Sequence, residues 1–238
     1  VSNIELSDQN VTIHNGEYYQ LSTIISPENA TNQAVEWTSS NNNVATVTQE
    51  GLVYAANIGS AVISVTTLDG SNLSAFCIIN VEPTLVTSLE IIPSDIDIYL
   101  GETTNLEINV LPSNAYNKEV IWSSSDDNIV MISSTGKVMA LAVGNAVVTA
   151  KAADGSGISA SCNVNVLPIL ISNIELTPDY INIYVGDSYS FSVEIQPTNA
   201  TNQELAWSSS NEEVALVSST GKVFAISEGT TTITASAL

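Results

Sequence analysis

The chain has 238 residues and carries 25 Asp and Glu against 4 Lys and Arg, for a formal net charge of −21. Nucleic acid and anionic lipid need clustered basic side chains to neutralise phosphate, so this composition makes both poor partners. No apolar run approaches the roughly 20 residues of a membrane-spanning helix, so we expect no direct membrane insertion in this segment. No signal peptide opens it, and an export signal or anchor is expected outside it.

One short pattern recurs three times. Each tryptophan of the chain is followed at the second and third positions by serine, and the spacing is 85 residues both times: Trp37, Trp122 and Trp207. Turn glycines and a loop proline keep the same register: Gly16, Gly101 and Gly186; Pro27, Pro112 and Pro197; Gly51, Gly136 and Gly221. A fixed period of this kind indicates repeated units. We predict three domains, at 1–83, 84–168 and 169–238.

Each copy begins with residues that alternate between apolar and polar, as in Ile4-Glu5-Leu6, which predicts a half-buried strand. A second short strand is expected to end at the first turn glycine, and a third to contain Leu21, Thr23 and Ile25. The pattern Pro-x-Asn-Ala-x-Asn then predicts a tight loop at 27–32, 112–117 and 197–202, because asparagine bonds its own backbone.

The tryptophan strand follows this loop. An indole between two sheets buries a large apolar surface, so Trp37, Trp122 and Trp207 are predicted to be core pins. After the next turn, Val53 and Ala55 are expected to face inward. The large residues between such pairs then face outward and form a candidate exposed apolar stripe, namely Tyr54, Met139 and Phe224.

The last two strands of a copy are joined by Asp-Gly, at Asp69-Gly70 and again at Asp154-Gly155, a strong hairpin signal. Cys77 and Cys162 share the inward face of the final strand, so both are expected to be free, buried thiols. With about seven short strands per copy and no helical period, the sequence predicts an all-β fold of three tandem antiparallel sandwiches.

The third copy is shorter than the other two. Leu238 aligns with Ala153 and Leu68, so we expect this copy to lack its last strand. The segment 231–235 would then be an unpaired edge, which invites pairing with an extended segment. We expect the native protein to continue beyond Leu238, and this edge to be frayed in isolation or filled by a strand from another chain.

The first copy carries an apolar patch that the fold does not require. Its last two strands are expected to turn Val62, Phe76 and Ile78 outward, where the second copy has Val147, Ser161 and Asn163. Contiguous exposed apolar surface often marks a contact site. These three residues are therefore a candidate contact patch for a partner, another copy or a neighbouring domain, and coverage by the copy's own loops is the alternative.

No catalytic or metal site can be assembled from the sequence. His14 is the only histidine, is expected to be a packed ring near a turn, and has no base or nucleophile arranged around it. Carboxylate pairs such as Asp95 with Asp97 do not recur at the 85-residue step, and no loop gathers the six to eight oxygens that calcium prefers. We expect no cofactor, with calcium as the weaker alternative.

Taken in order, the W-x-S-S, G-x-V/L-x-A and G-x-A/T-x-I/V strands of each copy resemble the bacterial immunoglobulin-like domain of group 2, over the whole chain. The resemblance implies an immunoglobulin-like sandwich without the inter-sheet disulfide of antibody domains. It also implies a cell-surface or extracellular protein, because such domains build adhesins, stalks and spacers in secreted glycan-processing enzymes. The family has no shared catalytic residue, and none is transferred here.

Two functional hypotheses follow. The first is a non-catalytic rod or stalk segment with a spacer or adhesion role, because the linkers at 81–85 and 166–170 are short, apolar and stiffened by proline. The second is a glycan-binding or accessory module of a carbohydrate-active enzyme, for which the exposed aromatic candidates are Tyr18, Tyr54, Tyr116 and Phe224. The ligand is thus expected to be a protein or glycan at the cell surface, and the oligomeric state is left open.

Overall fold

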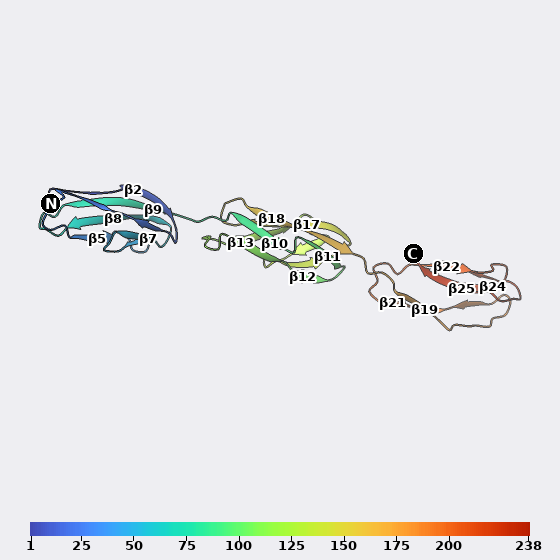
Figure 1. Ribbon diagram of the computed structural model, residues 1–238. Helices are drawn as coiled ribbons and strands as arrows, with labels where there is room; N and C mark the ends of the chain where they lie inside the picture. The colour runs from blue at the N-terminus through green and yellow to red at the C-terminus, as the bar shows by residue number, and fades with distance from the viewer. The chain divides into compact units, whose positions relative to one another are not determined.

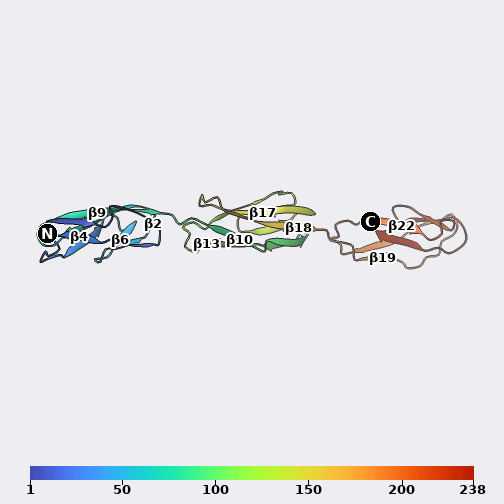
Figure 2. The ribbon, with the colours of Figure 1, turned by 45° about the horizontal axis from the view of Figure 1, so that its top comes forward.

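The computed structural model describes residues 1–238, and every regular element in it is a β-strand (Figures 1 and 2). The first repeat contains β1 (Asn3–Leu6), β2 (Asn10–His14), β3 (Tyr18–Gln20), β4 (Thr23–Ser26), β5 (Val35–Ser39), β6 (Ala45–Val47), β7 (Leu52–Ala55), β8 (Gly59–Thr67) and β9 (Ser74–Glu82).

The second repeat contains β10 (Ser88–Ile92), β11 (Asp95–Tyr99), β12 (Thr103–Asn105), β13 (Glu107–Leu111), β14 (Val120–Ser124), β15 (Val130–Ile132), β16 (Lys137–Ala140), β17 (Gly144–Ala152) and β18 (Ser159–Leu167). The third contains β19 (Asn173–Thr177), β20 (Ser188–Ser190), β21 (Ser192–Gln196), β22 (Leu205–Ser209), β23 (Ala215–Val217), β24 (Lys222–Ala225) and β25 (Ile233–Ala237).

The first repeat is a two-layer sandwich. One layer is a four-stranded sheet in the order β2-β9-β8-β5, and the other combines the pair β1-β4 with the three-stranded sheet β3-β7-β6. The second repeat has the same arrangement, with β11-β18-β17-β14 facing β10-β13 and β12-β16-β15. The prediction of an all-β fold built from immunoglobulin-like sandwiches is therefore confirmed.

Two details of the sandwiches differ from the sequence prediction. The residues predicted as a single strand around Leu21 form two strands, because the chain leaves the β3 ladder at Leu21 and Ser22 and then pairs with β1 through β4. One strand pair in each complete sandwich is also parallel: β2 runs parallel to β9, and β11 runs parallel to β18. Alternation of apolar residues is the same in parallel and antiparallel strands, so it did not reveal this.

The core of the first repeat lies between the two layers. Alternate side chains from both sheets are fully buried there, including Leu21, Val53, Ile63 and Ile79. Trp37, on β5, is only 5% exposed and packs into the same cluster. Its counterparts Trp122 and Trp207 are half-buried. The free thiols of Cys77 and Cys162 are buried, as expected from their inward position.

A turn glycine fits beneath the tryptophan ring. Gly51 has a φ of +81°, and its backbone carbonyl oxygen accepts a hydrogen bond from the N–H of Leu21 at 3.0 Å. A Cβ atom at this position would lie 2.5 Å from the carbonyl oxygen of Leu21 and 2.9 Å from Cζ2 of Trp37. Gly136 and Trp122 repeat this close approach in the second copy. Glycine is therefore required here both by the backbone conformation and by the space.

The third repeat departs from the other two. Its sheets are β19-β21, β20-β24-β23 and β22-β25, so the four-stranded layer is reduced to two strands. The second strand that the sequence predicts before Gly186 does not form, because the strand that pairs with it in the other repeats has no counterpart within these 238 residues. The core is correspondingly open: the buried hydrophobic residues are Ala200, Ala215 and Val223.

The fit beneath Trp37 leads to a stability prediction with an internal control. Gly51→Ala and Gly16→Ala place a side chain at similar positive φ values, +81° and +87°, but no atom lies within 4 Å of a Cβ at Gly16. Overpacking against Leu21 and Trp37 should therefore destabilise the first repeat by roughly 1–3 kcal/mol more in Gly51→Ala than in Gly16→Ala. Urea denaturation followed through the Trp37 indole resonance checks this. Equal losses would show that the ring does not require the glycine.

Candidate functional site

An aromatic pair lies on the outer face of the three-stranded sheet in the first repeat. Tyr18 on β3 is directly opposite Tyr54 on β7, and their ring centroids are 4.8 Å apart at an interplanar angle of 35°. Tyr18 is 65% exposed, whereas Tyr54 is half-buried. Two tilted rings on one sheet surface form a small apolar platform with polar hydroxyl groups.

The other members of the exposed apolar stripe have different neighbours. Met139 on β16 lies between Thr103 and Met131, and Phe224 on β24 lies between Ser188 and Leu216. Lys222 Nζ is 5.1 Å from the centre of the Phe224 ring, within the range of a cation–π contact. Met131 and Leu216 are further members of these outer faces that were not predicted, although alternation along β15 and β23 places them there.

The candidate contact patch lies on the outer face of the four-stranded sheet. Val62 on β8 is opposite Ile78 on β9, and Phe76 follows diagonally on β9 with 62% of its side chain exposed. Polar side chains adjoin the patch along the same face: Ser60 bonds Asn80 at 3.1 Å, and Asn80 bonds Asn10 at 2.8 Å. The three residues therefore form a small apolar surface with a polar border. Whether a partner covers it stays a prediction.

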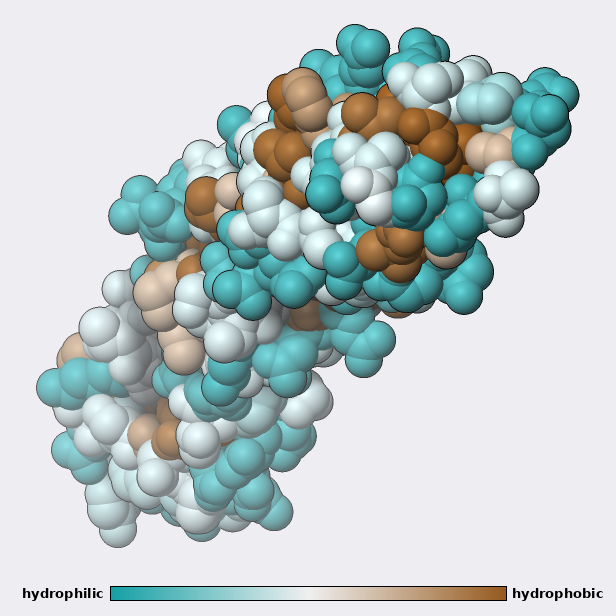
Figure 3. Space-filling model, turned by 90° about the vertical axis from the view of Figure 1, so that its left-hand side faces the viewer, coloured by the Kyte–Doolittle hydropathy of each residue, from teal (hydrophilic) through white to brown (hydrophobic).

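The same face is more polar in the second repeat. Thr149 and Ser161 share a hydrogen bond of 3.1 Å at the positions of Ser64 and Phe76. Asn163 Nδ2 donates to Asp95 Oδ1 at 2.7 Å. Viewed from the side that carries the N-terminus, hydrophobic residues gather in separate patches among hydrophilic ones (Figure 3). What repeats through the chain is therefore the inside of the sandwich, and the outer faces differ.

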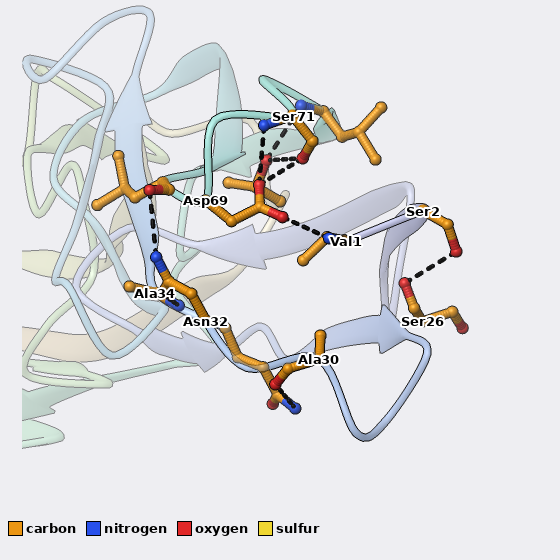
Figure 4. Close-up of polar contacts among 12 residues, drawn as sticks. Val1, Ser2, Ser26, Ala30, Asn32, Ala34, Asp69 and Ser71 are labelled. Atoms are coloured by element: carbon orange, nitrogen blue, oxygen red, sulfur yellow. Dashed lines mark hydrogen bonds and ion pairs between the residues drawn. The ribbon is translucent and has the colours of Figure 1, made fainter.

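A carboxylate connects the last hairpin of a repeat to its first residues. In the second repeat, Asp154 Oδ2 accepts the backbone N–H of Val86 at 2.5 Å and Oδ1 accepts that of Ser156 at 2.9 Å. In the first repeat, Asp69 accepts the amino group of Val1 and the N–H of Ser71 (Figure 4). These aspartates recur for a structural reason, which only the folded arrangement reveals.

The second asparagine of the Pro-x-Asn-Ala-x-Asn loop is also structural. Asn32 Oδ1 accepts the N–H of Ala34 at 3.0 Å, and its Nδ2 donates to the carbonyl oxygen of Leu68 at 3.3 Å (Figure 4). Asn117 and Asn202 make the first of these bonds in their own repeats. The loop is closed by its own side chain, as the sequence predicted.

The remaining ionisable groups do not form a reactive cluster. His14 is exposed, with Nδ1 3.6 Å from Glu17, so the expectation of a packed ring is wrong; the end of β2 leaves the side chain outside the core. Asp97 Oδ1 accepts Asn165 Nδ2 at 2.9 Å, as Asp95 does with Asn163. Burial raises the pKa of the Cys77 thiol. No group of three or more His, Cys, Asp or Glu side chains could hold a metal ion.

The structure contains no helix that is long and apolar enough to cross a membrane.

Two packed β-sheets with a tryptophan on a strand at their interface are typical of the immunoglobulin-like class of β-proteins. The model of the bacterial Ig-like domain (group 2) family matches this chain at residues 1–75, 85–164 and 171–237. The chain therefore belongs to that family, and the resemblance seen in its motifs is confirmed. The predicted domain boundaries at residues 83 and 168 stay a prediction.

Three relatives illustrate where such repeats occur. An uncharacterized protein of Clostridium acetobutylicum is 37% identical over 151 residues, 63% of this chain and 15% of that protein. The Ig-like virion protein of Serratia phage KSP90 is 30% identical over 138 residues, 57% of this chain and 54% of that protein. Kappa-carrageenase of Pseudoalteromonas carrageenovora is 42% identical over 67 residues, 28% of this chain and 17% of that protein. The chain spans less than two thirds of the length of each.

The Asp154 contact predicts a pH-dependent stability of the second repeat. Hydrogen bonds from the Ser156 side chain and from the Val86 and Ser156 amides lower the pKa of Asp154 from its ordinary value. The ionised carboxylate is therefore favoured in the folded state. Its contribution is fully present above the unfolded-state pKa of about 3.9 and is lost as the pH falls through the lower folded-state value.

Asp154→Asn should therefore lower the melting temperature of the second repeat at pH 7, and the difference from the parent should shrink as the pH falls below about 4. An asparagine presents an NH₂ group where Oδ2 accepts the Val86 amide. Hydrogen exchange of that amide and thermal melting provide the measurements, with the exposed Asp127→Asn as the control. A difference that stays constant down to pH 2 would contradict the assignment.

Proposed function

We propose that this chain is a non-catalytic spacer segment of a cell-surface or secreted protein, in which tandem immunoglobulin-like sandwiches separate or present other parts. The proposal rests on which residues recur in all three repeats and which do not. The glycine beneath the tryptophan, the loop asparagine and the inward side chains return in all three repeats.

The outer faces change from repeat to repeat. The aromatic pair of the first repeat is Thr103 and Met139 in the second, and Phe76 is replaced by Ser161. A function common to all three repeats must therefore rest on the sandwich and on its repetition. The net charge of −21 supports a solvated surface and opposes association between like chains.

The spacer proposal predicts an extended particle. Strands of about seven residues rising roughly 3.3 Å each, with their loops, give three stacked sandwiches a length on the order of 100 Å. Small-angle X-ray scattering measures the maximum dimension directly. The expected result is a pair-distance distribution with a long tail to that length at physiological salt. A compact globule, with all three domains in mutual contact, would overturn the proposal.

A glycan-binding role is the second candidate, and the Tyr18–Tyr54 pair is the observation that favours it. Sugar rings stack on exposed aromatic platforms, and these two rings lie side by side on one sheet. The similarity to part of a kappa-carrageenase adds a relative that is itself named for a polysaccharide. An adhesive role through the contact patch of Val62, Phe76 and Ile78 is the corresponding proposal for a protein ligand.

The two surfaces can be tested against each other. Tyr54→Ala should abolish retardation in a polysaccharide affinity gel and leave protein capture and self-association unchanged. Phe76→Ser should do the reverse, weakening self-association in sedimentation or protein capture in pull-down. Both side chains are on outer faces, so both variants should fold, and each controls for the other. If neither variant changes any binding, the spacer role alone remains.

A further inference from the structure

Two tyrosine rings of the first repeat are held beside each other by the backbone. Tyr18 on β3 and Tyr54 on β7 are direct cross-strand partners, and their ring centroids are 4.8 Å apart at an interplanar angle of 35°. The other close pair of aromatic rings, Tyr189 with Phe191, contains a single phenol. Tyr18 and Tyr54 are therefore the two of the chain's 8 tyrosines whose phenols lie side by side.

The β3–β7 ladder brings the two side chains closer than most cross-strand partners. Next to the pair, Ala55 N–H donates to the carbonyl oxygen of Glu17 at 3.0 Å, and Ala55 C=O accepts the N–H of Gly16 at 2.8 Å. Hydrogen-bonded and non-hydrogen-bonded pairs alternate along antiparallel strands, so Tyr18 and Tyr54, one step further, are a non-hydrogen-bonded pair. The Cα atoms of such a pair are about 4.5 Å apart, against about 5.5 Å in a hydrogen-bonded pair.

The phenols are accessible from solvent, whereas the thiols are not. Tyr18 is 65% exposed, and Tyr54 is half-buried on the same outer face. Thiolates are readily oxidised when solvent reaches them, but Cys77 and Cys162 are both 0% exposed. Burial also raises the pKa of both thiols, which keeps them in the less reactive protonated form. An oxidant in solution therefore reaches the tyrosine pair, and the thiols do not compete for it.

We propose that Tyr18 and Tyr54 are an oxidative cross-linking site, at which a one-electron oxidant driven by peroxide joins the two rings as dityrosine. The new bond links β3 to β7 on the outer face of the three-stranded sheet. This chemistry needs no sugar, so it is independent of the glycan-binding role proposed for the same rings.

The reaction balances with hydrogen peroxide and a haem peroxidase that transfers single electrons. Each phenol gives one electron to the oxidant and its O–H proton to water, which leaves two phenoxyl radicals with spin density on the ring carbons next to the C–O carbon. A carbon–carbon bond forms between one such carbon of each ring. The hydrogen on each bonded carbon then moves to the phenoxyl oxygen and restores both phenols, while hydrogen peroxide takes up two electrons and two protons and becomes two water molecules.

Coupling within one chain is favoured over coupling between chains. Tyr116 and Tyr184 are 56% and 85% exposed and can also form radicals, but neither has a second phenol beside it. They must meet another chain, and a net charge of −21 opposes that encounter. Tyr18 and Tyr54 are already positioned by the ladder, and fixed proximity of this kind is equivalent to a very high local concentration.

The cross-link supplies a constraint that the chain otherwise lacks. Both cysteines are free, so no disulfide connects two strands of the first repeat. A bond between residues 18 and 54 closes the intervening segment, including the tryptophan strand β5, into a loop. Cross-links of this kind limit the unfolded chain more than the folded one, so the linked form of the first repeat is the more stable.

The test oxidises the full chain at low concentration with hydrogen peroxide and a haem peroxidase, and then separates monomer from dimer by size-exclusion chromatography. The monomer should acquire dityrosine fluorescence, and its yield should not change on dilution. Cleavage after glutamate separates the two tyrosines into the peptides 18–28 and 51–82. Mass spectrometry should detect these peptides joined, with a mass lower by two hydrogen atoms than their sum.

Conservative variants assign the bond to the pair. Tyr18→Phe and Tyr54→Phe keep the ring and remove the phenol, so each should abolish the fluorescence of the monomer. Both residues are on the outer face, so both variants should fold, and unchanged amide protection in hydrogen exchange verifies this. Tyr116→Phe removes an exposed phenol that has no ring partner, and it should leave the monomer product unchanged and lower only the amount of cross-linked dimer.

The proposal is wrong if oxidation yields cross-links between chains alone, or if the monomer contains no 18–28 peptide joined to 51–82. It is also wrong if either phenylalanine variant keeps the fluorescence of the monomer, because another pair of tyrosines would then be the source.

Discussion

The strand that lies between β2 and β8 is the element on which a complete sandwich of this chain depends. It bonds to a neighbour on each side, and it contributes Cys77, Ile79 and Val81 to the core. The third repeat shows what the other strands do without it. The preceding segment at 180–184 forms no ladder, and Ile181 and Ile183 are half-buried, whereas Val11 and Ile13 at the same positions of the first repeat are buried. Pairing and burial are thus supplied together by one strand.

The features that depend only on local alternation could be predicted from the sequence, whichever strand the segment pairs with. Val53 and Ala55 alternate with Tyr54 in a two-residue period, and that period decides which side faces the core whatever the strand's partner is. The residues of the core and of the outward stripe could therefore be predicted from the sequence. The tryptophan and glycine at a constant spacing of 85 residues supplied the number of repeats in the same way.

Alternation does not predict which strands pair with each other. Ile181 and Ile183 alternate as well as their counterparts do, yet they form no strand, because a ladder needs a second strand that lies far away in the sequence. The same reasoning applies to the break at Leu21, where the pattern continues while the hydrogen-bond partner changes from β7 to β1. The role of Asp154 was also missed, since its contact with Val86 crosses 68 residues.

The surfaces that could bind a ligand are the least predictable part. Tyr18 and Tyr54 are 36 residues apart in the sequence, and only the β3–β7 register brings their rings together. The outward positions of Val62, Phe76 and Ile78 followed from the alternation of residues along β8 and β9. Alternation within two neighbouring strands therefore predicted one surface, whereas a long-range pairing defined the other.

The parallel pairing of β2 with β9 has a mechanical consequence. β2 follows the start of the first repeat and β9 precedes its end, so a pull on the two ends draws these strands along each other in opposite directions. The ladder bonds between them are then loaded in shear, all at once, instead of opening one after another. The parallel β11–β18 pair would be loaded in shear in the same way in the second repeat.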